Sequence, residues 1–179
     1  MPVIEPVPAD EITDKTLKKY LEQAEDLRVP DPLFVQIMAH SPSHANAVLD
    51  AMFESLAKGN VDPCLKEIIR IRLARQAKDP YFSGLRLKIA EDAGLTEERI
   101  DAGCGDFETS DAFTDAEKWA LRYAHLMFTE PKKVNQAFYD EGKQYWSEAE
   151  IMELGTLIAY HYGFDVWMRT LKALPLTAA

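Results

Sequence analysis

Charged residues inside apolar helical segments are the first candidates for chemistry in this sequence. Residues 64–77, CLKEIIRIRLARQA, are apolar nearly all round, as expected of a buried helix, and they carry Glu67. Asp79 follows at an Asp-Pro turn, and Arg86 lies beyond it. The helical neighbours of Arg86 are also apolar, so its side chain is predicted to enter the interior near Glu67. Because burying either charge alone is costly, each of these groups needs a partner or a ligand.

These side chains would suit an anionic substrate. Arg86 can bind a carboxylate through two parallel hydrogen bonds, and Glu67 or Asp79 can act as the base that moves a proton. Tyr81 lies in the same turn and is assigned, with Arg86, to substrate binding. A closed pair between Arg86 and Glu67 would instead be structural, so an open pocket around Arg86 is the feature that favours an enzyme.

A second polar stripe lies near the carboxyl end of the chain. His161, Asp165 and Arg169 are spaced four apart, so they share one face of a helix, and Tyr160 lies beside them. His161 or Tyr160 could supply a second proton, while Tyr160, Asp165 and Arg169 join the substrate-binding candidates. The alternative is a self-satisfied ladder of ion pairs with a structural role.

Metal and nucleotide sites are not indicated. His40 and His44 have a spacing that metal sites favour, but Ser41-Pro42 places a helix start between them, and HExxH does not occur. Nor do GxGxxG, GxxxxGK[ST] or GxSxG occur. We therefore expect no metal and no cofactor.

Composition and charge exclude several classes of partner. The 179 residues are 47% hydrophobic, enough for a single domain spanning 1–179, and the formal net charge of −10 disfavours binding to nucleic acid or to an anionic membrane. The first residues lack the features of a signal peptide, and no apolar run is long enough to span a membrane. Two isolated cysteines, Cys64 and Cys104, indicate a cytoplasmic protein without a disulfide framework.

The elements that must position these residues are helices. Residues 1–10 are proline-rich and expected to be extended, and no later segment alternates with period two. Capping boxes are predicted at Thr114 and Ser147, each with a glutamate three residues on. The pattern predicts an all-α fold of about eight helices, over 17–27, 43–57, 64–77, 84–93, 97–102, 116–128, 134–146 and 150–174.

Residues from about 38 to 175 resemble the carboxymuconolactone decarboxylase and alkylhydroperoxidase D-like family. The resemblance rests on KEIIRIRLARQAKDPYFSGLRLKIAEDAGLTEERI, with its helix opened by Glu67, its Pro-Tyr turn and its Ala-Gly-Leu stop. The closing GFDVWMRTLKAL is similar to the family's Asn-x-x-x-Arg ending, with Asp165 in the Asn place and Arg169 in the Arg place. The resemblance implies an alkylhydroperoxidase D-like helical bundle that assembles as a homo-oligomer, a trimer or hexamer, and the aromatic and methionine content of the late helices favours such assembly.

The chain departs from that family where redox chemistry would occur. Peroxidase-type members follow the glutamate with CxxCxxxH, but here Asp79 and Phe82 stand in the cysteine places and Arg86 in the histidine place. Peroxide reduction by a thiol pair therefore has no route through this motif. Family decarboxylases work without a cofactor, so the resemblance implies a cofactor-free acid–base enzyme, a lyase or isomerase acting on a small carboxylate or lactone.

Two other functions remain open from the residues. One is a non-catalytic oligomeric or ligand-binding member that has lost the redox chemistry, with Glu67 and Arg86 as a structural pair. The other, the least favoured, is a thiol-dependent hydroperoxide reductase using Cys64 or Cys104.

Overall fold

Helices make up the structure, a computed structural model that describes residues 2–176. They are α1 (Lys15–Leu27), α2 (Pro32–Met38), α3 (Pro42–Ala57), α4 (Pro63–Ala77), α5 (Pro80–Gly84), α6 (Lys88–Asp92), α7 (Glu97–Cys104), α8 (Asp115–Thr129), the short 3-10 helix η1 (Pro131–Lys133), α9 (Gln136–Gly142) and α10 (Glu148–Leu171). Within residues 2–176 there is no strand, and the all-α prediction is confirmed. None of the helices in this range is long and apolar enough to cross a membrane.

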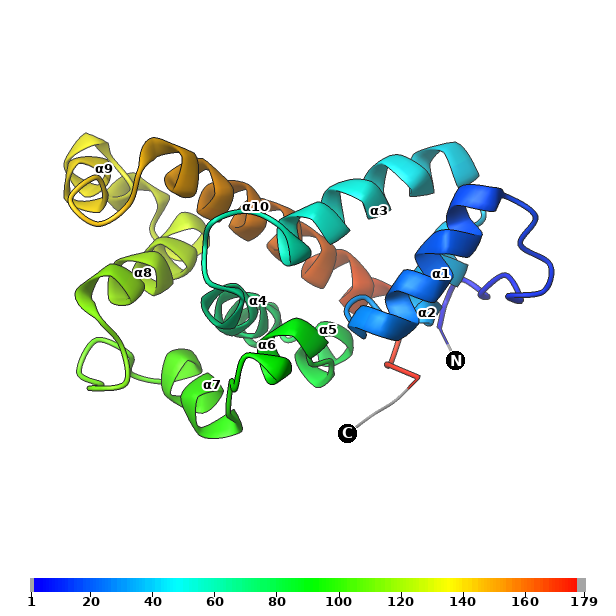
Figure 1. The fold of residues 1–179 in the computed structure, drawn as a ribbon, viewed down its shortest axis with the longest axis horizontal. Coiled ribbons are helices and arrows are strands. Elements are labelled where there is room, and N and C mark those ends of the chain that lie inside the picture. The colour runs from blue at the N-terminus through cyan, green and yellow to red at the C-terminus, as the bar shows by residue number, and fades with distance from the viewer. Residues whose placement is uncertain (1, 177–179) are drawn as a thin grey trace.

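Helix α4 runs through the middle of the molecule, as its apolar sequence predicts. It packs against α10 along much of its length and also contacts α7, α5 and α8 (Figure 1). Most of its residues between Cys64 and Ala77 are buried, including Lys66, Glu67 and Arg70, whereas Arg75 is exposed. The charges of Lys66, Glu67 and Arg70 are therefore desolvated and must be compensated inside the protein.

The predicted helix ends are mostly those observed. Thr114 and Ser147 form capping boxes with Glu117 and Glu150, and Gly94 ends α6 with a positive φ and a bond from Leu95 N to Ala90 O of 3.0 Å. These ends fix where the long helices begin and hence which faces they present.

Three features differ from the sequence prediction. The helix predicted over 134–146 is shorter in the structure, where α9 spans Gln136–Gly142. Helix α2, seven residues long between two prolines, was not predicted, and Asp31 caps it through a bond from Leu33 N. The helix predicted over 84–93 is interrupted, because Leu85 and Leu87 have extended backbone angles and α5 ends at Gly84. The interruption buries both leucines and leaves Arg86 in non-helical chain between them.

Candidate functional site

The buried carboxylate of α4 is paired with an arginine of the same helix. Arg70 Nε and Nη2 each donate to one oxygen of Glu67 at 2.7 Å, and both side chains are at most 1% exposed. Arg70 also donates to the carbonyls of Phe82 and Leu85 at 2.7 and 2.8 Å, while Glu67 accepts from Leu87 N at 2.8 Å. The pair thus satisfies both charges and holds the 82–87 segment against α4.

Asp79 is the N-cap residue of α5, and its carboxylate is used to cap that helix. Its carboxylate accepts from the backbone N–H groups of Tyr81 and Phe82 at 3.2 and 2.9 Å. Burial raises the pKa of Asp79, and these two bonds oppose the rise. Phe82, in the other place where the resemblance expects a cysteine, is fully buried. Both positions therefore form core rather than an open reactive site.

The predicted entry of Arg86 into the interior is wrong. Arg86 Nε and Nη2 pair with the two carboxylate oxygens of Glu97 at 2.5 and 3.0 Å, and the arginine side chain is 21% exposed. Because the chain is extended on either side of Arg86, the helical spacing used to place it does not apply there. Glu67 has Arg70, rather than Arg86, as its ionic partner.

A small cavity nevertheless brings Arg86 and Glu67 to a common wall. It has a volume of about 230 Å³, and Glu91 and Glu97 also line it. Each of these carboxylates already has an arginine partner, Glu67 with Arg70, Glu91 with Arg28 and Glu97 with Arg86, so the cavity wall offers little net positive charge to an anion. Glu97 already occupies the two-pronged face of Arg86, so a substrate carboxylate would have to displace it.

Tyr81 lies away from both this cavity and the surface. It is fully buried, and its hydroxyl donates to Asp31, which also accepts from Leu176 N at 2.7 Å. Burial, with the nearby Asp31 charge, raises the pKa of Tyr81 well above its ordinary value. The contacts of Tyr81 are those of a residue that holds α5 to the chain around Asp31.

His161 and a hydroxyl from α3 form the contact best suited to proton transfer. His161 Nε2 lies 3.4 Å from Ser55 Oγ, and the imidazole is fully buried, edge-on to Phe82. Burial, together with the positive charge of Arg70, lowers the pKa of His161 to about 3. The ring is therefore neutral at neutral pH, with one nitrogen that can donate and one that can accept a hydrogen bond, and it is a weaker base than an ordinary imidazole. Ser55 was not among the residues singled out from the sequence, because α3 and α10 are far apart along the chain.

Asp165, one helical turn after His161 in α10, is a buried carboxyl group in an unusual environment. It is fully buried, and neither of its oxygens has a hydrogen-bond partner among residues 2–176; the same holds for His161 Nδ1. Burial raises the pKa of Asp165 well above its ordinary value, because the interior disfavours the charged form of its carboxyl group. Orphaned polar atoms of this kind are rare in protein interiors and indicate a bound water, a ligand or a reactive role.

The other members of the stripe have separate partners. Arg169 Nη1 donates to the carbonyl of Ala77 at 2.6 Å, and the Tyr160 hydroxyl donates to the carbonyl of Val48 at 2.7 Å. Across the described part of the chain, His161, Asp165 and Arg169 make no ion pair with one another. The ladder considered from the sequence is therefore not formed.

Ser55 lines an open cavity between α3 and α10. The cavity has a volume of about 500 Å³, and its wall includes Glu54, Lys58, Glu153 and Tyr160. Both glutamates are paired, Glu54 with Lys58 and Glu153 with the buried Lys66. The charges of the wall are thus compensated, and the Ser55 hydroxyl stands between the cavity and the buried imidazole.

The Gly59 turn at the edge of this cavity depends on a close approach. Gly59 has a φ of +102°, and a Cβ there would lie 2.2 Å from a Glu153 oxygen. The Glu153 carboxylate accepts from the N–H groups of Asn60 and Val61 at 2.9 and 3.3 Å. The absence of a side chain at Gly59 therefore allows Glu153 of α10 to bind the backbone of the turn that follows α3.

Neither cysteine replaces the absent thiol pair. Cys64 is buried and Cys104 half-buried, both are free, and burial raises the pKa of each thiol. A raised pKa reduces the thiolate fraction that redox chemistry requires. Within residues 2–176, no cluster of three or more histidine, cysteine, aspartate or glutamate residues could hold a metal ion.

Comparison with solved structures identifies the architecture. No protein-family model and no curated protein matches the chain. The apo crystal structure of the debrominase Bmp8 is 22% identical with a TM-score of 0.80, covering 98% of this chain and 92% of that one. An alkylhydroperoxidase D core protein, an uncharacterized peroxidase-related protein from Ralstonia eutropha JMP134, is 15% identical with a TM-score of 0.77, covering 98% and 93%. A peroxidase-related protein from Silicibacter sp. TM1040 is 10% identical with a TM-score of 0.78, covering 97% and 92%.

The sequence resemblance and these structures agree. At such low identities the likeness establishes the fold and leaves the chemistry to be argued from the residues. The chain has the alkylhydroperoxidase D-like helical fold, without the paired cysteines of the family's redox motif.

Proposed function

We propose that this protein is a cofactor-free acid–base enzyme, a lyase or isomerase, that acts on a small lactone or carboxylate in the cavity beside Ser55. The observation that carries the proposal is the 3.4 Å approach of His161 Nε2 to Ser55 Oγ at the wall of a cavity of about 500 Å³. The fold is compatible with catalysis, since one protein that shares it is a debrominase.

The proton path needs only two side chains. Ser55 takes a proton from the substrate as it passes its own to His161 Nε2, and the reverse transfer returns a proton to another substrate atom. The Ser55 hydroxyl also contacts the Met52 carbonyl at 2.8 Å, so it must turn toward His161 for the transfer.

The cavity favours a neutral lactone over a free carboxylate. Its acidic side chains are already paired with lysines, so these lysines are not free to bind the carboxylate of a substrate. A neutral ring carrying one carbonyl avoids the repulsion that the negative protein would exert on an anion. A neutral substrate would therefore bind at the cavity wall that includes Tyr160, and not at Arg86 as the sequence predicts.

Isomerisation of a simple lactone tests the proposal. In α-angelica lactone, removing a proton from the carbon next to the carbonyl and returning it to the γ-carbon gives β-angelica lactone, with no other reactant. We expect the protein to accelerate this conversion, and to incorporate deuterium from D2O, as followed by proton NMR. Ser55→Ala and His161→Gln should each slow it by about 100-fold or more, as expected when a positioned acid–base group is lost.

A cysteine-free variant is the matched control for that experiment. Cys64→Ser/Cys104→Ser should keep the full isomerisation rate, because neither thiol lies at the Ser55 cavity. An isomerisation that survives in both Ser55→Ala and His161→Gln would refute the proposal, and one that disappears in the double serine variant would favour thiol chemistry.

A non-catalytic role is the second candidate, and one observation favours it. The place of the redox motif is occupied by the closed Glu67–Arg70 pair and by buried Phe82, and beside Glu67 and Arg86 a small cavity of about 230 Å³ remains. Such a protein would bind a small ligand without turnover, and the same lactones and the carboxylate levulinate would raise its melting temperature while remaining chemically unchanged.

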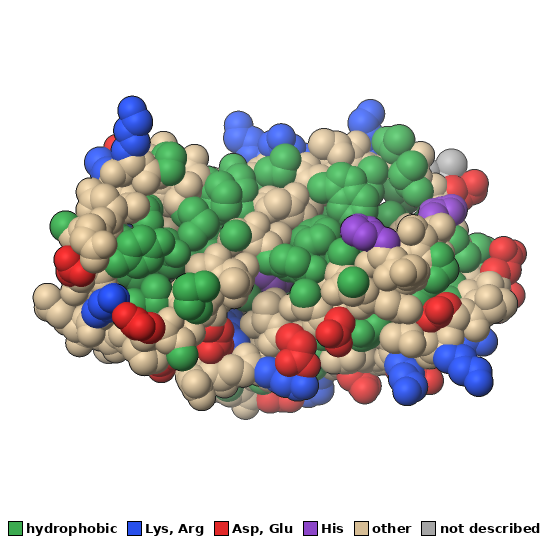
Figure 2. Space-filling view, turned by 90° about the horizontal axis from the view of Figure 1, so that it is seen from above, with side chains coloured by type: hydrophobic (Ala, Val, Ile, Leu, Met, Phe, Trp, Pro, Cys, Tyr) green, Lys and Arg blue, Asp and Glu red, His purple; other side chains and the backbone are tan. Residues whose placement is uncertain are grey.

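We also propose that the chain forms a homo-oligomer, a trimer or hexamer. Several large apolar side chains are exposed, including Phe128, Tyr145, Trp167 and Met152, the last being 65% exposed. Hydrophobic side chains cover much of the face seen in Figure 2, whereas charged groups lie mostly along its edges. Exposed apolar surface of this kind is typical of subunit interfaces. Light scattering at micromolar concentration should give a multiple of the 20.3 kDa chain mass, and a monomer would rule out assembly.

A further inference from the structure

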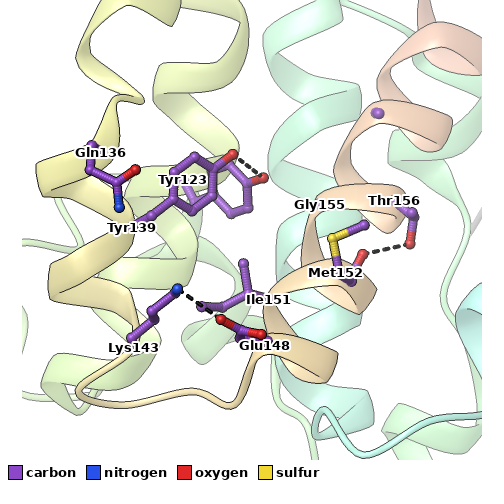
Figure 3. A pocket seen from close by; sticks show the side chains of 10 residues that line it. Tyr123, Gln136, Tyr139, Lys143, Glu148, Ile151, Met152, Gly155 and Thr156 are labelled. Carbon is purple, nitrogen blue, oxygen red and sulfur yellow. Dashed lines mark hydrogen bonds and ion pairs between the residues drawn. The ribbon is translucent and has the colours of Figure 1, made fainter.

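A second cavity, separate from the Ser55 cavity, lies between α8, α9 and the first turns of α10. It has a volume of about 530 Å³, within the range of small-molecule sites, and its wall is largely apolar. Figure 3 shows Tyr123 and Tyr139 on one side, Met152 and Gly155 of α10 on the other, and Lys143 with Glu148 at a third. Among residues 2–176, Thr156 of α10 is the one residue that lines both this cavity and the Ser55 cavity.

The two tyrosine hydroxyls leave one hydrogen-bond donor unused. Tyr123 Oη and Tyr139 Oη lie 3.0 Å apart, so one hydroxyl donates to the other. Each phenol has one hydrogen, and within residues 2–176 neither hydroxyl makes another hydrogen bond. The accepting hydroxyl therefore keeps its own hydrogen for an acceptor inside the cavity. Burial is the main reason that the pKa of Tyr123 is raised, so this donor stays protonated across the working range of a protein.

Gly155 makes room for this arrangement. A Cβ at Gly155 would lie 2.8 Å from the Tyr123 hydroxyl oxygen, too close for any substituent without moving the phenol. A Cβ at Gly163, further along α10, would have no atom of residues 2–176 within 4 Å apart from its chain neighbours and the backbone of its own helix. Because glycine weakens a helix interior, its presence at Gly155 is best explained by the space that the hydroxyl pair needs.

Charge at the cavity is balanced. Lys143 Nζ pairs with Glu148 at 2.8 Å, and the remaining wall includes Ile151, Met152 and Ala159. A charged ligand would find no free counter-charge, whereas a neutral molecule would bury apolar surface and satisfy the spare hydroxyl hydrogen.

We propose that this cavity binds a neutral, predominantly apolar small molecule, aromatic or alicyclic, through one carbonyl or ether oxygen that accepts from the Tyr123–Tyr139 pair. The site stands apart from the Ser55–His161 contact and does not depend on the acid–base function.

Prodan, a neutral naphthyl ketone whose emission responds to polarity and to hydrogen bonding at its carbonyl, is the probe. Wild-type protein should bind one prodan per chain in a saturable titration. Gly155→Ala should raise the dissociation constant at least tenfold, while Gly163→Ala, the same change on the same helix, should leave it unaltered. Tyr123→Phe/Tyr139→Phe removes both hydroxyls without orphaning either, so it should fold and should weaken binding by about three- to tenfold.

Four results would contradict the proposal. The first is a titration that does not saturate at one site, and the second is equal binding by Gly155→Ala and Gly163→Ala. The third comes from sedimentation velocity on the same samples: prodan released as the chain self-associates would assign the cavity to contact with a second copy. Retained affinity in the double phenylalanine variant would remove the assigned role of the hydroxyl pair.

Discussion

Replacing Arg70 by methionine should destabilise the protein by about 3–5 kcal/mol, the range typical of breaking one side of a buried ion pair. The guanidinium is fully buried and makes two bonds to Glu67 and two to the backbone carbonyls of Phe82 and Leu85, at the end of α5. Its loss would leave a carboxylate in the interior without its counter-ion and would take one of its donors from each of these two carbonyls. Urea unfolding followed by circular dichroism measures the change.

Arg86→Met is the matched control for that experiment. Arg86 also pairs with a carboxylate, but it is partly exposed and its partner Glu97 is 61% exposed, so solvent can replace the interaction. We expect a loss of about 1 kcal/mol or less. If both methionine variants lost the same stability, the Glu67–Arg70 pair would not be the buried support that its geometry indicates.

A double variant separates the two costs of losing Arg70. Glu67→Gln/Arg70→Met removes both charges, while the glutamine oxygen can still accept from Leu87 N. Its stability should lie between those of the wild type and of Arg70→Met, because no uncompensated carboxylate remains. A double variant less stable than Arg70→Met would contradict this explanation.

Much of this arrangement follows from local sequence. The apolar surroundings of Glu67 predicted a buried carboxylate that needs a partner, and the structure places it in the interior with one. The partner was available from the sequence as well, since Arg70 is three residues along the same helix, where side chains meet. The search for a partner on the next helix instead led to Arg86, and that inference failed because the chain is extended at Leu85 and Leu87. Short helices with weak periodicity are where helical spacing is least reliable.

The Ser55–His161 contact could not be predicted from the spacing of residues in the sequence. The stripe on α10 was visible because its residues recur every four positions, but Ser55 belongs to α3, and only the packing of the two helices brings them together. The orphaned oxygens of Asp165 are likewise a property of tertiary structure, because whether a polar atom finds a partner depends on every element around it.

Acid should destabilise the protein through His161. The imidazole has a pKa of about 3 in the folded state against an ordinary value of 6.5, so between these values the unfolded chain binds a proton that the folded protein does not. Stability therefore falls as pH decreases through this window. With about 1.4 kcal/mol for each pKa unit, the loss from this group should be roughly 2 kcal/mol at pH 5 and approach 4 kcal/mol or more near pH 3.

His161→Gln removes this loss while keeping an amide that can reach Ser55. The difference in unfolding free energy between pH 7 and pH 5 should therefore be about 2 kcal/mol smaller in His161→Gln than in the wild type. Asp165 acts in the opposite sense, since its raised pKa stabilises the folded state at low pH and that contribution declines as pH rises; it is present in both proteins and largely cancels from the comparison. His44→Gln, which removes an exposed histidine of α3, should keep the wild-type pH dependence. Equal pH dependence in His161→Gln and wild type would show that the imidazole is solvated or already paired in the folded protein, in contradiction to its buried position.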